Sequence, residues 1–227
     1  TGWGDSTANV VMILRERDGG EKTRALRAEV LEGTDDGDKS LMVFDSPADV
    51  KGSAVLTFAH RTGDDDQWLY LPALKRVKRI AAANKSSPFM GSEFSYEDLA
   101  SQELQKYTYE WIRDEPCPVK EDGALTCFVV ERRPTDDDSG YVRQRVWLDQ
   151  NQYRAVRIDY YDRKDQLLKT LTFTDYRPYL DRYWRAHTMT MENLQSGKRT
   201  VLSWKDYRFR VGLSDSDFTP RALARTR

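Results

Sequence analysis

The sequence predicts a mainly β protein built from antiparallel hairpins, and two observations lead to this class. Apolar and polar residues alternate with a period of two along most of the chain, in segments rich in Val, Thr, Tyr, Trp and Phe. Polar turn sequences such as Asp18-Gly19-Gly20, GTDDGD at 33–38 and Ser196-Gly197 separate these segments at regular intervals. The pattern leaves three architectures open: a sandwich, a barrel or one large curved sheet.

Eleven segments carry the alternation, and we expect that number of strands or slightly more. In chain order they span residues 8–17, 39–44, 53–60, 67–71, 106–112, 126–132, 142–148, 155–161, 167–173, 184–191 and 200–211. In the first segment, Val10, Met12 and Leu14 fall on one face, and Val11 and Ile13 on the other. A sheet with apolar residues on both faces has to be covered on both sides or has to curl around something.

Short helical signals between the strands supply little covering material, and we expect it on one side of the sheet. Ser46, Pro47 and Asp49, followed by Gly52, predict a single helical turn at 45–52. Further helix starts are predicted at Ser87-Pro88, at Ser95 with Asp98, and at Thr219-Pro220. Helices of this length can cover one face of a large sheet but cannot wrap it.

The segment KSSPFMGSEFSYEDL at 85–99 places large apolar side chains among serines, glycine and acidic residues. Two interpretations of Phe89, Met90, Phe94, Tyr96 and Leu99 stay open. In the first they fill the core of a curved sheet, since apolar residues usually form core. In the second they form a mobile lid over an apolar cavity, with Gly91 as a hinge and methionine as an adaptable contact.

A cluster of four cations, Lys75, Arg76, Lys78 and Arg79, precedes that segment. The net charge of −1, from 36 basic and 37 acidic residues, and a pI near 6.2 argue against nucleic acid as a partner. We expect the cluster to contact an anionic headgroup or an acidic partner at the mouth of a cavity, or to protect an edge strand from pairing.

The two cysteines, Cys117 and Cys127, flank PVKEDGALT, whose Asp122-Gly123 pair is a hairpin turn signal. An even count at this spacing favours a structural disulfide in an oxidising compartment, with two reduced, buried thiols as the alternative. Closing so short a loop would stabilise the fold by about 2–3 kcal/mol. Two cysteines and two distant histidines lack the ligand spacing of a zinc site, and we expect neither a metal nor another cofactor.

Catalytic motifs are absent from the sequence, which has no G-x-S-x-G, H-E-x-x-H, P-loop or G-x-G-x-x-G pattern. His60 and His187 lie in predicted strands, where a structural role is the commoner one for histidine. The aspartate triplets at 64–66 and 136–138 lack the alternating ligands and the glycine of a calcium loop. We therefore expect a protein that is not an enzyme.

Length and composition fit one domain that spans residues 1–227. Hydrophobic residues at 39% and charged residues at 32% allow a buried core with a polar surface. No run approaches the roughly 18 consecutive apolar residues of a membrane-spanning helix. The chain opens at Thr1 without a signal peptide, which leaves a processed or trimmed start open.

Seven stretches spread over nearly the whole chain carry a family resemblance. They are GWGDSTANVVMILR, KSLMVFDSPADVKGSAVLTF, DQWLYLPALKRVKRI, NKSSPFMGSEFSYEDL, YYDRKDQLLKTLTF, YWRAHTMTMENLQSGK and WKDYRFRVGLSDSDFT. Together they resemble the LolA/LolB-like superfamily of periplasmic outer-membrane lipoprotein-sorting proteins, in particular the LolA-like branch associated with RND-type exporters.

The resemblance implies a strongly curved, incomplete β-barrel, made of a single antiparallel sheet whose apolar concave face is covered by short helices. In the carriers of this superfamily, that cavity takes the acyl chains of lipoproteins crossing the periplasm. Residues 85–99 would then form the lid, and an oxidising periplasm supports the disulfide. The residues expected at the cavity or lid are Phe89, Met90, Phe94, Tyr96, Leu99, Trp68 and Leu71, with Lys75, Arg76, Lys78 and Arg79 as headgroup or partner contacts.

Members of this superfamily normally begin with a signal peptide and an N-terminal helix that packs on the open barrel, and this chain starts after both. We expect a periplasmic carrier or chaperone that binds lipid or lipoprotein acyl chains for transport toward the outer membrane. The alternative is a non-enzymatic periplasmic interaction module that docks on an inner-membrane RND-type transporter, with its cavity filled by its own side chains. Neither function involves nucleic acid or a membrane span.

Overall fold

The computed structural model describes residues 2–119 and 125–223. Thirteen strands form one antiparallel sheet in the order β6-β5-β4-β3-β2-β1-β13-β12-β11-β10-β9-β8-β7, which confirms the predicted class. The strands are β1 Asp5–Arg15, β2 Glu21–Leu31, β3 Lys39–Ser46, β4 Ala54–Phe58, β5 Asp66–Leu71, β6 Arg76–Ile80, β7 Tyr107–Pro116, β8 Thr126–Pro134, β9 Arg143–Asp149, β10 Ala155–Tyr161, β11 Leu167–Tyr179, β12 Tyr183–Asn193 and β13 Arg199–Phe209. The sheet is open, because its edge strands β6 and β7 do not pair with each other.

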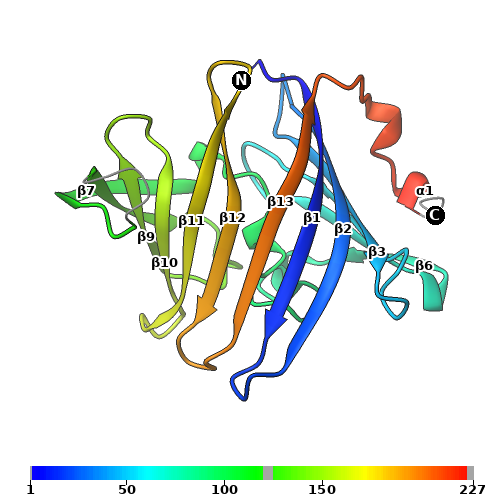
Figure 1. Ribbon diagram of the computed structural model, residues 1–227, viewed down its shortest axis with the longest axis horizontal. Helices are drawn as coiled ribbons and strands as arrows, with labels where there is room; N and C mark the ends of the chain where they lie inside the picture. The colour runs from blue at the N-terminus through cyan, green and yellow to red at the C-terminus, as the bar shows by residue number, and fades with distance from the viewer. Residues whose placement is uncertain (1, 120–124, 224–227) are drawn as a thin grey trace.

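At the centre of the sheet, β1 and β13 lie side by side although they come from opposite ends of the chain (Figure 1). Their ladder places Val10 opposite Trp204 and Met12 opposite Leu202. Every other neighbouring pair of strands is consecutive in the sequence. The sheet therefore consists of two meanders, β1–β6 and β7–β13, which the central ladder joins.

Two of the strands, β2 and β6, were not among the predicted segments. Strand β2 is rich in charged residues, yet it pairs with β1 along its whole length and buries Leu26 and Ala28. Strand β6 has the sequence RVKRI and pairs with β5 at the edge of the sheet. In β6, pairing with a neighbour decides the structure, and a pattern of apolar residues does not. In β2, the alternation of Leu26, Ala28 and Val30 with Arg27 and Glu29 was a usable strand signal.

Short helices lie between the strands. They are η1 Pro72–Leu74, η2 Ala82–Asn84, η3 Phe89–Gly91, η4 Glu97–Leu99, η5 Leu104–Lys106, η6 Asp215–Asp217 and α1 Pro220–Leu223. The predicted starts at Ser87-Pro88, Ser95 and Thr219-Pro220 precede η3, η4 and α1. Residues 45–52 form a hydrogen-bonded turn instead of a helix, in which the Lys51 N–H donates to the Pro47 carbonyl at 2.9 Å.

We call residues 82–106, which contain η2 to η5, the covering segment. It lies against one face of the sheet, and we call this face the concave face. The main hydrophobic core forms between the two. Phe89 and Phe94 are fully buried there, and Phe89 packs edge-on against Tyr96, with ring centroids 5.7 Å apart. The sheet side of this core takes alternate residues of successive strands, such as Met12 of β1 and Leu202 of β13.

The opposite face of the sheet is also covered, which corrects the expectation that helices lie on one side only. Leu41 and Val43 of β3 point away from the concave face, and the C-terminal residues Phe218 and Leu223 pack on them. Helix α1 contacts β4, and Figure 1 shows it at the outer side of β3. Both faces of β3 and β4 are apolar, so an exposed second face would cost solvation free energy.

A disulfide joins Cys117 and Cys127, as predicted, with their Cα atoms 5.0 Å apart. It closes the hairpin between β7 and β8 and belongs to a small third core with Val129, Trp147 and Val156. The predicted Asp122-Gly123 turn lies outside the described residues.

Candidate functional site: a cavity on the concave face

A cavity of about 300 Å³ lies between the concave face and residues 98–102 of the covering segment. Its lining is mainly apolar and comes from both meanders of the sheet. The apolar lining residues are Val30, Met42, Leu99, Ala100, Ile158, Leu171, Phe173, Met189, Leu202 and Trp204, and the polar ones include Asp38, Ser40, Thr57, Ser101 and Gln102. A volume of this size is at the lower end of the range for small-molecule sites.

Strand register brings the apolar wall of the cavity together. Phe173 of β11 is opposite Met189 of β12, and Met189 is in turn opposite Leu202 of β13. Leu171 of β11 is likewise opposite Ile158 of β10. Because residues opposite each other in an antiparallel ladder point to the same face, these side chains form one continuous apolar surface.

The covering segment is held to the sheet by buried polar contacts. Lys169 of β11 forms an ion pair with Asp98, in which Nζ and Oδ2 are 2.6 Å apart. Asp98 also accepts hydrogen bonds from the Tyr141 hydroxyl at 2.8 Å and from the Ser95 N–H at 2.7 Å. Arg24 of β2 donates to the Met90 carbonyl. The segment is thus anchored to both meanders.

Glu97 lies next to that ion pair and is held by loop 139–140. Its carboxylate accepts hydrogen bonds from the Ser139 hydroxyl and from the Gly140 N–H, both at 3.0 Å. Burial, together with the neighbouring charge of Asp98, raises the pKa of Glu97 to about 7. Glu97 therefore changes its charge near neutral pH.

The predicted cavity and lid residues divide into groups. Phe89, Phe94 and Tyr96 belong to the covering segment but are buried in the main core, and they do not line the cavity. Met90 is partly buried against the same core. Leu99 alone among these predicted residues lines the cavity.

The expected position of Trp68 at the cavity is corrected by the fold. Trp68 of β5 packs on the opposite face of the sheet, edge-on against Phe58 with ring centroids 5.1 Å apart. Its neighbour Gln67 points to the concave side, where it donates to the Tyr96 carbonyl at 3.0 Å. Leu71 has the same parity as Gln67 but lies at the end of β5, outside the cavity lining.

The four predicted cations lie at the β6 edge of the sheet and do not line the cavity. Strand register separates them by face: Arg76 and Lys78 share a face with Leu71 and Leu69, while Arg79 is opposite Trp68. Arg79 forms an ion pair with Asp66. The cluster is therefore divided between the two faces of an edge strand.

Both histidines are engaged in structural contacts. His60 Nδ1 is 2.5 Å from an Asp36 oxygen and Nε2 is 3.3 Å from an Asp66 oxygen, and the bond to Asp36 raises the pKa of His60. His187 is buried and bonded to the Tyr179 hydroxyl at 2.8 Å, and burial lowers the pKa of this imidazole. Neither histidine lines the concave-face cavity.

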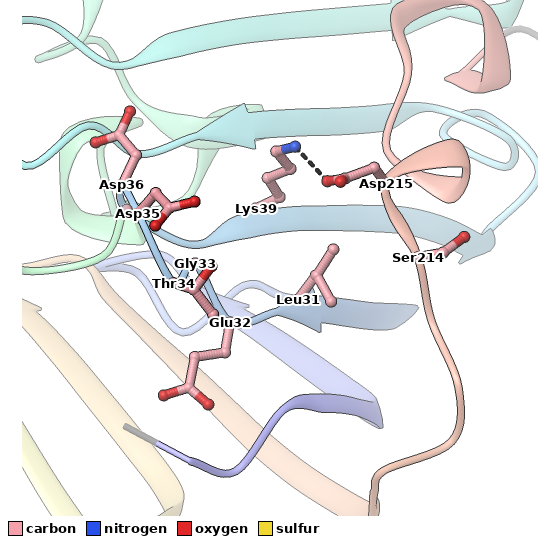
Figure 2. A pocket seen from close by; sticks show the side chains of 10 residues that line it. Leu31, Glu32, Gly33, Thr34, Asp35, Asp36, Lys39, Ser214 and Asp215 are labelled. Carbon is pink, nitrogen blue, oxygen red and sulfur yellow. Dashed lines mark hydrogen bonds and ion pairs between the residues drawn. The ribbon is translucent and has the colours of Figure 1, made fainter.

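A second pocket, of about 440 Å³, lies between the β2–β3 loop and the C-terminal segment. Figure 2 shows Lys39 reaching across it to Asp215, with Nζ and Oδ1 2.5 Å apart, while Glu32, Asp35 and Asp36 surround it. Charged and polar groups dominate this pocket, so it is poorly suited to an acyl chain.

Sequence reasoning missed Lys169, Asp98 and the strand residues of the apolar wall as site residues. Asp98 was used only as a helix cap, and Lys169 interrupts an apolar strand in LLKTLTF. A buried lysine needs a charged partner, so this interruption was a usable signal.

The described residues include no helix long and apolar enough to span a membrane. They also include no group of three or more His, Cys, Asp or Glu side chains that could hold a metal ion.

A family model with the description "-like: Uncharacterized protein" matches residues 36–225. A Vibrio parahaemolyticus domain assigned by name to outer-membrane lipoprotein sorting is 54% identical, with 98% of this chain and 92% of that chain covered and a TM-score of 0.93. A DUF1329 family protein from Desulfovibrio piger is 35% identical, with 96% and 91% covered and a TM-score of 0.89.

A LolA superfamily protein from Nitrosomonas europaea is 24% identical, with 96% of this chain and 91% of that chain covered and a TM-score of 0.74. This likeness shows that the fold is LolA-like. Among curated proteins, none matches the chain.

Proposed function

The chain belongs to the family of outer-membrane lipoprotein-sorting domain and DUF1329 proteins, and on this premise we propose that it is a periplasmic carrier that binds lipid or lipoprotein acyl chains. The observation that carries the proposal is the apolar cavity between the concave face and residues 98–102. The disulfide between Cys117 and Cys127 supports an oxidising compartment such as the periplasm.

Burial of hydrocarbon supplies the binding free energy. Each methylene moved from water into an apolar cavity contributes roughly 0.8 kcal/mol, so a chain can be held without a charged anchor. The wall formed by Ile158, Leu171, Phe173 and Met189 offers such a surface. No chemical step is needed, and the histidines are occupied by structural hydrogen bonds.

Movement of the covering segment would govern uptake and release. Residues 98–102 form one wall of the cavity, and the anchors Asp98–Lys169 and Arg24–Met90 hold the segment in place. Because this wall borders the cavity, we expect the segment to move when cargo enters or leaves.

The experiment that tests the carrier function has two parts. Protein purified from the periplasm of its own host is analysed for bound lipid by native mass spectrometry, and the delipidated protein is titrated with a fluorescent fatty-acyl probe. We expect stoichiometric probe binding, which Met189→Asp on the cavity wall abolishes. A matched control is Leu180→Asp, an exposed loop leucine away from the cavity, which should leave binding unchanged. Absence of both co-purified lipid and probe binding would rule out the carrier.

A second candidate, an interaction module that docks on an RND-type transporter, is favoured by the exposed aromatic side chains of the edge strand β7. Trp111 is 62% exposed and Tyr109 is 46% exposed. An edge strand has unpaired backbone groups that can add a partner strand. This role predicts that Trp111→Ala abolishes capture of the transporter's periplasmic part while probe binding persists.

The β6 cations supply a proposed contact for an anionic partner or a membrane headgroup. Arg76 and Lys78 lie on the concave side of the edge strand. Replacing both with glutamate should weaken binding to vesicles with anionic lipids, with a loss that shrinks as salt is raised, and should leave vesicles of neutral lipids unaffected. An equal change for both kinds of vesicle would rule out the electrostatic contact.

A further inference from the structure

The lining of the concave-face cavity has an unbalanced charge. It contains the carboxylates of Asp38 and Asp98 and, among the described residues, no lysine or arginine. The charge of Asp98 is balanced by Lys169 from outside the lining, at 2.6 Å. Among the described cations, none forms an ion pair with Asp38. The cavity therefore presents one uncompensated negative charge.

Asp38 is held in place by two hydrogen bonds. Its Oδ1 accepts the Gly33 N–H at 3.0 Å and its Oδ2 accepts the Ser101 hydroxyl at 3.1 Å. Both donors are uncharged groups, so neither offsets the charge of the carboxylate. The field of Asp38 consequently acts on whatever occupies the cavity next to it.

The cavity has a polar end and an apolar end. Asp38 precedes β3, in which Ser40 is opposite Thr57 of β4, and the bond from Ser101 brings the covering segment to the same place. The apolar wall of β10–β13 lies on the other meander of the sheet. An amphiphile would therefore place its head near Asp38 and its chain along the wall.

A further carboxyl group lies near the polar end of the cavity. Burial and the charge of Asp38 raise the pKa of Glu103, which places a second carboxyl group beside it. Two cations also lie near Glu103, outside the lining: Lys106 forms an ion pair with Asp65, while Arg61 donates to the neutral Thr34 carbonyl at 2.9 Å and keeps its positive charge. An anionic head would find like charge here and no available cation in the lining.

The cavity volume limits the chain. A methylene group takes roughly the 30 Å³ that a water molecule takes in the liquid, so about 300 Å³ holds a single chain of about ten carbons. Two or three chains together would not fit while the covering segment stays in place.

Building on the proposed carrier function, we propose that this cavity selects amphiphiles with one medium-length chain and an uncharged or cationic head, and rejects those with an anionic head. The head lies at Asp38, Ser40, Thr57 and Ser101, and the chain lies along the wall that contains Phe173. The same chemistry is presented by a free neutral lipid and by the amide-linked acyl chain of a lipidated protein.

The test is a competition assay against 1-N-phenylnaphthylamine, an uncharged fluorescent probe, at pH 8 and below the micelle-forming concentration of each competitor. The competitors are decyl maltoside, decyltrimethylammonium and decanoate, which share a ten-carbon chain. An N-decanoyl dipeptide amide represents the acyl chain of a protein, whereas decyl maltoside represents a free lipid. We expect the uncharged and cationic competitors to bind at least about tenfold more tightly than decanoate, a ratio that falls as salt is raised.

Chain length and one variant complete the test. Affinity for maltosides of eight to sixteen carbons should rise up to about ten carbons and then level off. Asp38→Asn should tighten decanoate binding by about tenfold, so that its affinity approaches that of decyl maltoside. The control Asp35→Asn removes the same charge from an exposed position in the same loop and should change neither.

The outcomes separate this inference from the carrier function. If decanoate binds as tightly as decyl maltoside, or if Asp38→Asn does not change the affinity for decanoate, the cavity does not select against anionic heads. The carrier function would still stand. Affinity that keeps rising to sixteen carbons overturns the limit on chain length. If neither the probe nor any competitor binds, the carrier function itself fails, and the selection fails with it.

Discussion

Lys169 Nζ on β11 lies 2.6 Å from Asp98 Oδ2 in the covering segment and 2.9 Å from the Glu93 carbonyl oxygen. The side chains of Lys169 and Asp98 are only 6% and 1% exposed. Removing two charges from water offsets most of their attraction, so such a pair adds little net stability, but losing one partner leaves a buried charge without compensation. The pair therefore determines where the covering segment sits on the sheet.

Replacing Lys169 with methionine tests that anchor. Lys169→Met keeps the length of the side chain but leaves the Asp98 charge buried, so we expect the free energy of unfolding to fall by about 3–5 kcal/mol. Urea denaturation monitored by tryptophan fluorescence measures the change.

The double variant Lys169→Met with Asp98→Asn is the control for this prediction. It removes both charges while the asparagine can still accept the Tyr141 hydroxyl, so most of the lost stability should return. If the double variant lost as much stability as Lys169→Met and Asp98→Asn together, the two residues would not interact.

Glu97 should make stability depend on pH. Its pKa is about 7 in the folded chain and near 4.5 when unperturbed. Because the folded pKa is the higher one, its stabilising contribution is fully present below about pH 4.5 and is lost as pH rises through 7, a loss of up to about 3 kcal/mol. Glu97→Gln should abolish this dependence and be more stable than the parent at pH 8, as measured by denaturation from pH 4 to 8. Parallel pH profiles for the two proteins would contradict the prediction.

Phe89 and Leu99 distinguish the core from the cavity within the same covering segment. Phe89 is fully buried against Phe44 and Tyr96, so Phe89→Ala should cost about 3–5 kcal/mol. Leu99 borders empty space, so Leu99→Ala should cost less than about 2 kcal/mol but weaken binding of a fatty-acyl probe several-fold. Denaturation and probe titration of both variants check this. The reverse order of stability losses would show that Leu99 belongs to the core.

The disulfide should contribute measurable stability. Replacing Cys117 and Cys127 together with alanine opens a loop with a sequence separation of 10, and we expect a loss of about 2–3 kcal/mol. Alanine avoids placing a hydroxyl at Cys127, which is fully buried. Reduction of the parent protein should reproduce the loss in a denaturation experiment. An unchanged free energy of unfolding would mean that the hairpin is fixed by its packing alone.

The strand content of this chain could be predicted from alternation, and the position of the cavity could not. Alternation shows which residues share a face, but the choice of the concave face depends on the covering segment. For this reason Trp68 was placed at the cavity, although it lies on the opposite face and its neighbour Gln67 is the one that faces the concave side. The Lys169–Asp98 pair joins residues 71 positions apart, and no local pattern connects them.

Phe89 and Phe94 illustrate the same limit from the covering segment. Their spacing among serines and glycine fits a lid and a core equally well, and the structure makes them core within the segment that covers the sheet. Strand β6 was not predicted, because its cations leave no apolar face and an edge strand does not need one.

The central ladder between β1 and β13 has a consequence for the order of folding. The Asn9 side chain donates to Asp206, a residue 197 positions away, whereas every other neighbouring pair of strands is consecutive in the chain. Distant pairing carries the largest loop-closure cost, so each meander can form before the two halves meet.

The cavity forms only when the two halves of the sheet join. Met42 comes from the first half, while Met189 and Trp204 come from the second, and the pocket between them does not exist until the halves join. On the proposed carrier function, we expect a bound amphiphile to slow unfolding of the finished protein and to leave the rate of its folding unchanged, because it has nothing to bind until the sheet is complete.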